Sequence, residues 1–388
     1  EYRMDAYIVK AGKMILGDGL EAKENAGLLI ENGKIAKVYD NMASVEIPAG
    51  MKVVDYGDSV VIPGMIDCHN HLALDARLEN HLVKMEDCEA EQTIRAIKTM
   101  KDDLMAGVTT ARCLGDRFYI DVTCKKAQKE GRITGPKLVV SGIGMRSTHG
   151  HGYVGMPHCG PEEFRKTARE NIARGVDFLK VFMTKVINAT PFIYHFLTLD
   201  ELKVVVEEAK SVNITTACHC SGGQGLDDCL TAGIDCLEHV YYITPQQVER
   251  VKREDRWVVY TPSYALNDEL LFKFSPHDKE GSLREKEIIC RCLSGAIEGE
   301  LKFGIGTDGL HAGLAQEACY IAGLGAKNRD VLAGITINAA RLCGVDESTG
   351  SIAEGKAADL VVLEKDPLEN VEALKGVQSV IQDGVVIR

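Results

Sequence analysis

The sequence predicts an α/β protein that contains a (β/α)8 TIM barrel and a small β-sandwich domain formed by both termini. Three features support this prediction. Eight apolar, strand-like runs occur within residues 60–308, and helix-like segments lie between them. Strands that alternate with helices are typical of a parallel sheet, and eight such units favour a closed barrel. The two ends of the chain instead contain short strand-like runs separated by turns.

Each predicted barrel strand is a short apolar run. In chain order these runs occupy residues 60–71, 107–115, 137–145, 176–183, 214–220, 236–243, 257–263 and 302–308. The first run, VVIPGMIDCHNH, turns at Pro63-Gly64 and ends in two histidines one residue apart.

The helix-like segments between the runs carry start and stop signals. The segment at 89–106 ends before Gly107, as a helix C-terminus does, and the segment at 161–175 starts with a proline in its first turn. Thr198 and Glu201 form a capping-box pattern at the start of a third helix, over 198–211. Two shorter segments, at 222–233 and 244–255, fill the next gaps.

The chain ends predict a second, composite domain. Residues 1–59 contain Asn32-Gly33 between two strand-like runs, and residues 350–388 contain Asp383-Gly384 in a similar place. Both dipeptides are typical of tight β-hairpin turns. We therefore expect residues 1–59 plus 350–388 to form one small β domain, and residues 60–349 to form the barrel domain.

Composition excludes several classes of partner. The net charge is -12 and the chain has no Lys/Arg-rich run, which argues against nucleic-acid and membrane-surface binding. No apolar run approaches the roughly 18 residues of a membrane span, and residues 1–13 lack the apolar core of a signal peptide. The 13 cysteines are odd in number and scattered, which predicts a reducing, cytoplasmic location. Zinc ligation by Cys218 and Cys220 stays an open alternative.

Candidate functional residues gather where the predicted barrel strands end. Active sites of such barrels lie at the C-terminal ends of the strands. His69 and His71 share one face at the end of the first strand, because residues two apart point the same way. The other candidates are Lys180 on the fourth strand, His219 on the fifth, His239 on the sixth and Asp308 after the eighth. Each histidine alone could be a structural rim residue, and Asp308 alone could be a turn residue.

Together these residue types indicate a metal site. Imidazole and carboxylate ligands suit zinc and similar divalent ions. Lys180 lies in an apolar run, where burial favours its neutral amine, which can add CO2 to give a bidentate N6-carboxylysine. Two metals about 3.5–4 Å apart would activate a water as hydroxide and polarise a carbonyl. Asp308 could take the proton from this water and return it to the leaving amine.

Several longer motifs cover nearly the whole chain: PGMIDCHNHL, GVTTARCLG, DFLKVF, TTACHC, GIDCLEHV, GIGTDG and the tail TINAARLCGVDESTGSIAEGKAADLVVLEKDPL. Through these motifs the sequence resembles the amidohydrolase superfamily of metal-dependent hydrolases. The resemblance implies a binuclear centre bridged by a carboxylated lysine. Its metal ligands match His69, His71, Lys180, His219, His239 and Asp308.

Within the superfamily the chain looks most like the branch of prolidase-like, Xaa-Arg carboxypeptidase-like, ochratoxinase-like and imidazolonepropionase-related enzymes. This similarity implies substrate contacts by His151 in RSTHGHG, by Tyr242 (or Tyr241) after the sixth strand, and by Arg112. The alternatives are a loop histidine, a packed tyrosine and a structural salt bridge. The chain departs from the branch at three further positions: His149 replaces a glycine, Cys113 replaces an aspartate, and Lys185 lies where the branch has a Gly-rich loop.

The resulting expectation is a binuclear amidohydrolase that cleaves an amide bond to a C-terminal amino acid in a dipeptide or N-acyl amino acid. Zinc is the expected metal, with manganese or cobalt as alternatives, and CO2 is needed for lysine carboxylation. One alternative is a mononuclear cyclic-amide hydrolase or deaminase of the imidazolonepropionase kind, which would not need Lys180. Another is a non-catalytic barrel. The resemblance also implies a homo-oligomer with a small-molecule substrate.

Overall fold

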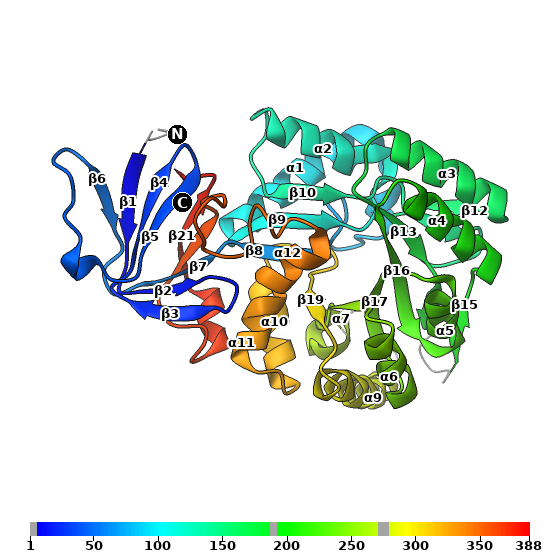
Figure 1. The fold of residues 1–388 in the computed structure, drawn as a ribbon. Coiled ribbons are helices and arrows are strands. Elements are labelled where there is room, and N and C mark those ends of the chain that lie inside the picture. The colour runs from blue at the N-terminus through cyan, green and yellow to red at the C-terminus, as the bar shows by residue number, and fades with distance from the viewer. Residues whose placement is uncertain (1–5, 187–191, 271–278) are drawn as a thin grey trace.

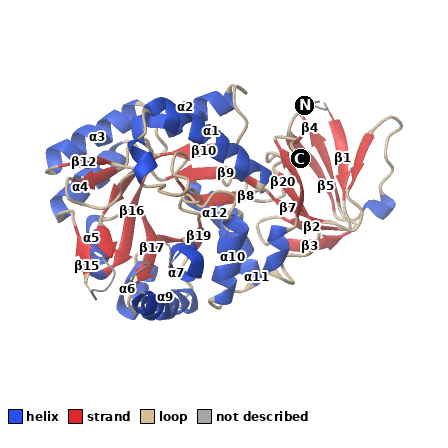
Figure 2. Cartoon of the chain, turned by 180° about the vertical axis from the view of Figure 1, so that it is seen from behind, coloured by secondary structure: helices blue, strands red, loops and turns tan. Residues whose placement is uncertain are grey.

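The computed structural model describes residues 6–186, 192–270 and 279–388. Figure 1 shows two bodies: a strand-rich body, which contains the blue N-terminal and red C-terminal segments, and a larger body in which strands and helices alternate. Figure 2 shows the same division from behind. Among the described residues, no helix is long and apolar enough to cross a membrane.

Eight parallel strands build the larger body. They are β8 (Met65–Asn70), β9 (Val108–Cys113), β10 (Lys137–Val140), β13 (Phe178–Phe182), β16 (Thr215–Gly222), β17 (Cys236–Tyr242), β18 (Trp257–Tyr260) and β19 (Phe303–Ile305). Parallel pairing runs from β8 through β9 to β10, and from β13 through β16, β17 and β18 to β19. Hydrogen bonds between the backbones of Asp177 and Val140 (2.8 Å) and of Asp308 and His69 (2.7 Å) join these two series. The predicted (β/α)8 barrel is confirmed.

Helices surround this ring. They are α1 (Glu89–Met105), α2 (Ile120–Lys129), α3 (Pro161–Ala173), α4 (Leu199–Ser211), α5 (Gly223–Ala232), α6 (Pro245–Arg253), α7 (Ser263–Leu266), α9 (Lys279–Glu298), α10 (Leu314–Gly323), α11 (Asn328–Gly334) and α12 (Ile337–Cys343). The capping box of α4 forms as predicted, since the Thr198 side chain accepts a hydrogen bond from the Glu201 N–H. Four short strands lie in the loops: β11 (Met145–Ser147), β12 (Met156–His158), β14 (Thr184–Val186) and β15 (Ile193–His195).

Two sheets form the strand-rich body. One contains, in order, β5 (Lys34–Tyr39), β4 (Gly27–Glu31), β1 (Ala6–Lys10) and β6 (Lys52–Asp55). The other contains β22 (Val385–Val386), β21 (Val377–Gln382), β20 (Leu360–Leu363), β7 (Val60–Pro63), β2 (Lys13–Leu16) and β3 (Glu21–Glu24). Tyr7, Leu28, Val61 and Leu360 share one buried cluster, so side chains of both sheets form this core. The strands of this sandwich therefore come from both ends of the chain.

The strand predicted at 60–71 is divided in the structure. Its first half, β7, pairs with β2 and β20 in the terminal sandwich, and its second half, β8, begins the barrel. The break falls at Gly64, where an added Cβ would overlap the side chain of Thr109 on β9. On this pairing we propose that the boundary between the two domains follows Pro63, rather than residue 59 as the sequence pattern suggests.

The seam between the last and first barrel strands is tightly packed. Buried Asp67 on β8 accepts hydrogen bonds from the backbone N–H (3.1 Å) and the hydroxyl (2.7 Å) of Thr307. At Gly306 a Cβ would overlap both the Cβ and the backbone nitrogen of His69. The close approach of the two strands therefore requires glycine at this position.

We predict that Gly306→Ala lowers the free energy of unfolding by about 1–3 kcal/mol, because the added methyl group overpacks the seam. Urea unfolding of the metal-free protein measures this change. Gly295→Ala is the matched control, because Gly295 lies within helix α9 and a Cβ added there would have no neighbouring side chain or strand within 4 Å. Alanine at this position should stabilise the protein by about 0.5–1 kcal/mol. Equal stability of the two variants would contradict the packing argument.

Candidate metal centre

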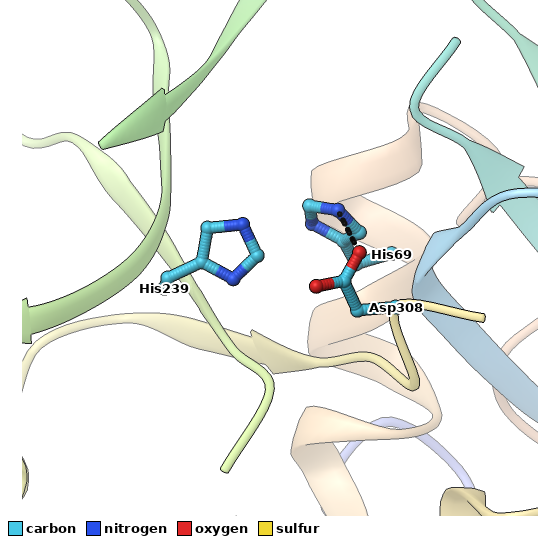
Figure 3. A group of neighbouring side chains, drawn as sticks. All are labelled: His69, His239 and Asp308. Atoms are coloured by element: carbon cyan, nitrogen blue, oxygen red, sulfur yellow. Dashed lines mark ion pairs between the residues drawn. The ribbon is translucent and has the colours of Figure 1, made fainter. Parts of the chain in front are cut away.

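The structure brings the six predicted ligand positions to one rim of the barrel. His69 Nε2 lies 3.3 Å from Asp308 Oδ1, and His71 Nε2 lies 3.4 Å from the same oxygen. Ligand atoms of His69, His239 and Asp308 all lie within 4.8 Å of one another, and Figure 3 shows the imidazole of His239 and the Asp308 carboxylate beside His69. Residues far apart in sequence thus form one cluster at the strand ends.

His219 and Lys180 lie beside this cluster. The ring centroids of His219 and His239 are 4.4 Å apart. Lys180 lies in β13, which pairs with the strand of His219, and its side chain is fully buried. Burial lowers the pKa of Lys180, although the charges of Glu238 and Asp308 act in the opposite sense. A larger fraction of the Lys180 side chain is therefore the neutral amine than in an exposed lysine.

Several buried nitrogens in the cluster have no hydrogen-bond partner among the described residues. They are His69 Nε2, His239 Nε2 and Lys180 Nζ. Leaving a buried polar atom unpaired costs roughly 1–3 kcal/mol, so such atoms are rare in native proteins. Burial also lowers the pKa values of His219 and His239 well below the usual range, so both rings are neutral, the form that binds a metal. The donor set therefore fits divalent metal ions.

The second ring nitrogen, Nδ1, has a hydrogen-bond partner in three of these histidines. His69 Nδ1 lies 2.8 Å from Glu238 Oε2, and His71 Nδ1 lies 2.8 Å from the carbonyl oxygen of Gly115. His239 Nδ1 lies 2.7 Å from Thr261 Oγ1. An acceptor at Nδ1 keeps the proton there and leaves Nε2 free as a ligand. The rings of His69 and His71 are thus oriented toward the centre of the cluster.

Glu238 connects this orientation to Arg112. The Arg112 guanidinium is only 2% exposed, donates to Glu238 Oε1 at 2.9 Å and to the carbonyl oxygen of Cys68 at 3.2 Å, and lies over the Phe178 ring. Despite complete burial, the positive charge of Arg112 and the His69 ring hold the pKa of Glu238 well below its usual range. Arg112, expected to contact substrate, has the surroundings of a structural salt bridge that positions a ligand histidine.

Backbone strain coincides with the cluster. His239, Val240 and Asp308 adopt positive φ angles of 77°, 48° and 52°, a left-handed conformation that non-glycine residues rarely adopt. The backbone carbonyl oxygen of Asp308 accepts a hydrogen bond from the Tyr264 hydroxyl at 2.8 Å, and the backbone N–H of Asp308 donates one to the carbonyl oxygen of His69. Strain of this kind persists where surrounding contacts hold it, and it is concentrated at functional sites.

A cavity of about 320 Å³ opens onto the cluster. Side chains of the metal cluster line it together with aromatic and apolar groups, among them Leu74, Tyr153, Val154, Phe182, Ala265 and Ile289. A largely apolar pocket with a few convergent polar groups is typical of a small-molecule site.

The predicted substrate contacts have different surroundings. His151 lines the cavity, its ring centroid lies 4.7 Å from that of His219, and its Nδ1 has no partner among the described residues. Burial, reinforced by the nearby charge of Lys185, lowers the pKa of His151 to about 4, so the ring is neutral at pH 7. Tyr242 also lines the cavity, but its hydroxyl donates to Glu285 Oε1.

The other residues that the sequence analysis singled out, namely Tyr241, His149, Cys218 and Cys220, have partners outside the candidate metal cluster. The hydroxyl of Tyr241 donates to the Thr261 carbonyl oxygen at 2.7 Å, and His149 Nδ1 lies 2.8 Å from Ser147 Oγ within its own loop. Cys218 lies on the opposite face of β16 from His219, with its Sγ 3.3 Å from Cys229 Sγ. The group of possible metal-binding side chains found among the described residues is His69, His239 and Asp308, so the structure gives no support to zinc binding at Cys218 and Cys220.

Sequence reasoning did not identify Glu238, Thr261, Tyr264 or Glu285. Glu238 had a usable signal, since it is a charged residue inside the apolar run CLEHVYY and a buried carboxylate requires a partner. The other three lie in segments with no distinguishing pattern, and only the folded chain brings them to the cavity or its ligands.

Comparison with known proteins gives a consistent result. The model of the amidohydrolase family matches residues 60–387. Ochratoxinase from Aspergillus niger is 29% identical over 405 residues, which cover 95% of this chain and 83% of that protein. Imidazolonepropionase from Picrophilus torridus is 24% identical over 394 residues, which cover 92% and 91%. The solved structure of A. niger ochratoxinase aligns with a TM-score of 0.85 at 25% identity and covers 99% of this chain and 96% of that one.

We predict that Glu238→Gln weakens metal binding about 10–100-fold, because the neutral amide cannot fix the His69 proton as a carboxylate does and leaves Arg112 without its counter-charge. Competition with a chelator measures the metal affinity, and circular dichroism checks the fold. Glu249→Gln, at an exposed position of α6, is the control and should bind metal as the unmodified protein does. Unchanged affinity in Glu238→Gln would refute the positioning role.

Proposed function

The chain belongs to the amidohydrolase family, and from this premise we propose that it is a binuclear amidohydrolase that releases a C-terminal amino acid from a dipeptide or N-acyl amino acid. Membership of this family and the similarity to ochratoxinase identify the chain as a hydrolase that acts on carbon–nitrogen bonds. The single observation that carries the binuclear proposal is Lys180, buried without a partner among the described residues beside histidines that also have unpaired ring nitrogens. A mononuclear centre would leave this lysine unexplained.

Six side chains would hold the two ions: His69, His71, His219, His239, Asp308 and Lys180 as N6-carboxylysine. Carboxylation joins the neutral amine to CO2, forms an N–C bond and releases one proton. The product is an anion with two oxygens, which suits a position between two cations. Zinc fits this nitrogen and oxygen donor set, and manganese or cobalt also fits. When bound, the ions acidify a water and polarise the scissile carbonyl.

Asp308 is the proposed proton carrier. Although burial acts in the opposite direction, the neighbouring imidazoles hold the pKa of Asp308 well below its usual range, so the side chain is a carboxylate. In this proposal its oxygen accepts the proton of the attacking water and returns it to the leaving nitrogen. The hydrogen bond from Tyr264 to the Asp308 carbonyl holds the backbone of this residue in place.

The cavity supports a small substrate. A volume of about 320 Å³ suits a dipeptide or N-acyl amino acid. The N–H of neutral His151 can donate a hydrogen bond to the substrate carbonyl oxygen, and the hydroxyl of Tyr242 can contact the substrate if it exchanges its bond to Glu285. The predicted cytoplasmic location and homo-oligomer stay predictions.

We predict turnover of N-acyl amino acids or dipeptides in a panel that varies the C-terminal residue, measured as release of the free amino acid. The control panel contains lactams and amino-substituted heterocyclic rings. Turnover of the control compounds alone would favour the cyclic-amide or deaminase alternative, for which the imidazolonepropionase relative provides a precedent. The result therefore separates two classes of hydrolase within one family.

We predict that Lys180→Ala loses activity and one or both metals, because the bridging group is absent, and that short-chain carboxylic acids partly restore both. Elemental analysis of protein purified with bicarbonate and without chelator should give close to two metals per unmodified chain. Lys203→Met, at an exposed position of α4, is the control. Full activity of Lys180→Ala would exclude the carbamate, and one metal per unmodified chain would favour a mononuclear centre.

A further inference from the structure

Lys185 lies at the cavity beside the proposed reaction centre. It is the middle residue of β14, which follows the strand of Lys180 and pairs with β15 through the Lys185–Tyr194 register. Lys185 lines the cavity with His151, Phe182 and Ser221. It is also one of the positions where the sequence departs from the related branch, so its role has to be inferred from this chain alone.

Lys185 lacks a counter-ion in the part of the chain that the structure describes. No carboxylate there lies within 4.0 Å of its Nζ, although the side chain is half-buried. Other partly buried lysines are paired: Lys13 with Asp366 at 2.8 Å, and Lys137 with Asp359 at 2.9 Å. In a chain with a net charge of -12, an unpaired ammonium at a cavity wall is an exception.

Neighbouring groups leave this side of the cavity positively charged. The Arg146 guanidinium lies 5.9 Å from the centre of the Tyr153 ring, and Tyr153 lines the cavity together with Lys185. The two carboxylates that line the cavity are engaged elsewhere. Asp308 forms ion pairs with His69 and His71, and Glu285 accepts a hydrogen bond from the Tyr242 hydroxyl. Nothing described in the cavity neutralises Lys185.

We propose that Lys185 binds the carboxylate of the substrate's C-terminal amino acid. The inference rests on the proposed function and narrows it to amides whose leaving amine carries a carboxylate. An ammonium and a carboxylate form a short charge-assisted hydrogen bond, about twice as strong as a neutral one. The partial exclusion of water from the cavity strengthens this attraction. Lys185 thus selects the substrate and holds the leaving group, while the metal cluster acts on the scissile bond.

The kinetic test compares the best N-acyl amino acid of the panel with the same compound converted to its C-terminal carboxamide. Lys185→Met should raise KM for the carboxylate about 10–100-fold, with kcat within about twofold and the carboxamide constants unchanged. Lys185→Arg, which keeps the charge, should retain most of the preference for carboxylate. An equal effect of Lys185→Met on both compounds would overturn the proposal, as would an unmodified enzyme that does not distinguish them.

A binding test needs no turnover. Calorimetry with phenylacetate and phenylacetamide should show a preference for the carboxylate that Lys185→Met abolishes and exposed Lys203→Met retains. Loss of the preference in a protein inactive on the panel would refute the proposed function and still support a carboxylate site at Lys185. Retention of the preference in an active Lys185→Met enzyme would refute the Lys185 proposal alone. Lys185→Gln provides a second variant should the methionine variant fail to fold.

Discussion

The cost of burying polar atoms without partners is the constraint on which the functional rim depends. His69 Nε2, His239 Nε2 and Lys180 Nζ lie in one buried cluster, and each lacks a hydrogen-bond partner among the described residues. A fold retains such a cluster when a ligand compensates for the cost. The Nδ1 atoms of the same rings have partners: Glu238 and the carbonyl oxygen of Gly115 accept hydrogen bonds from His69 and His71, and Thr261 Oγ1 is hydrogen-bonded to His239 Nδ1. The Nδ1 atoms thus have hydrogen-bond partners, whereas the Nε2 atoms of His69 and His239 and Lys180 Nζ have none among the described residues. Within the same part of the chain, His69 Nε2 has only its ion pair with Asp308. This contrast orients the rings and leaves their Nε2 atoms available to a ligand.

The rim also depends on closure of the barrel. Its candidate ligands lie on or directly after the first, fourth, fifth and sixth strands and, for Asp308, in the loop that follows the eighth, so no local segment contains the site. The bond between the Asp308 N–H and the His69 carbonyl oxygen lies at the seam, where Gly306 permits the close approach. The strained backbone of Asp308 is held by this bond and by the hydrogen bond from the Tyr264 hydroxyl. The geometry of the strands therefore sets the geometry of the candidate metal ligands, and a change at the seam would move His69 and Asp308 relative to each other.

Much of this arrangement could be predicted from local sequence patterns, because apolar runs, hairpin dipeptides and capping residues act over a few positions. Asn32-Gly33 and Asp383-Gly384 form the expected turns with positive φ at both residues. The break between β7 and β8 could not be located, since both halves of VVIPGMIDCHNH are apolar and only their pairing partners differ. The contact between Arg112 and Glu238 spans 126 positions and leaves no local signal. Helix α9 lies between the last two predicted strand runs and helices α10 to α12 lie after the last of them, and the sequence patterns did not identify these helices.

The pairing of β7 with β20 has a consequence for the evolution of the barrel. Pro63 and Leu360 are neighbours in this antiparallel pair, so the strands just before and just after the barrel segment are fastened to each other. This strand pair, which we call the β7–β20 clasp, holds together the two ends of a chain segment of nearly three hundred residues. Because the entropy of loop closure grows with the logarithm of length, doubling the enclosed chain costs only about 0.6 kcal/mol. Insertions and rewritten loops at the rim are thus thermodynamically inexpensive, and a chain with this clasp can exchange the segments around His149 or Lys185 while it keeps the scaffold that holds the metal ligands.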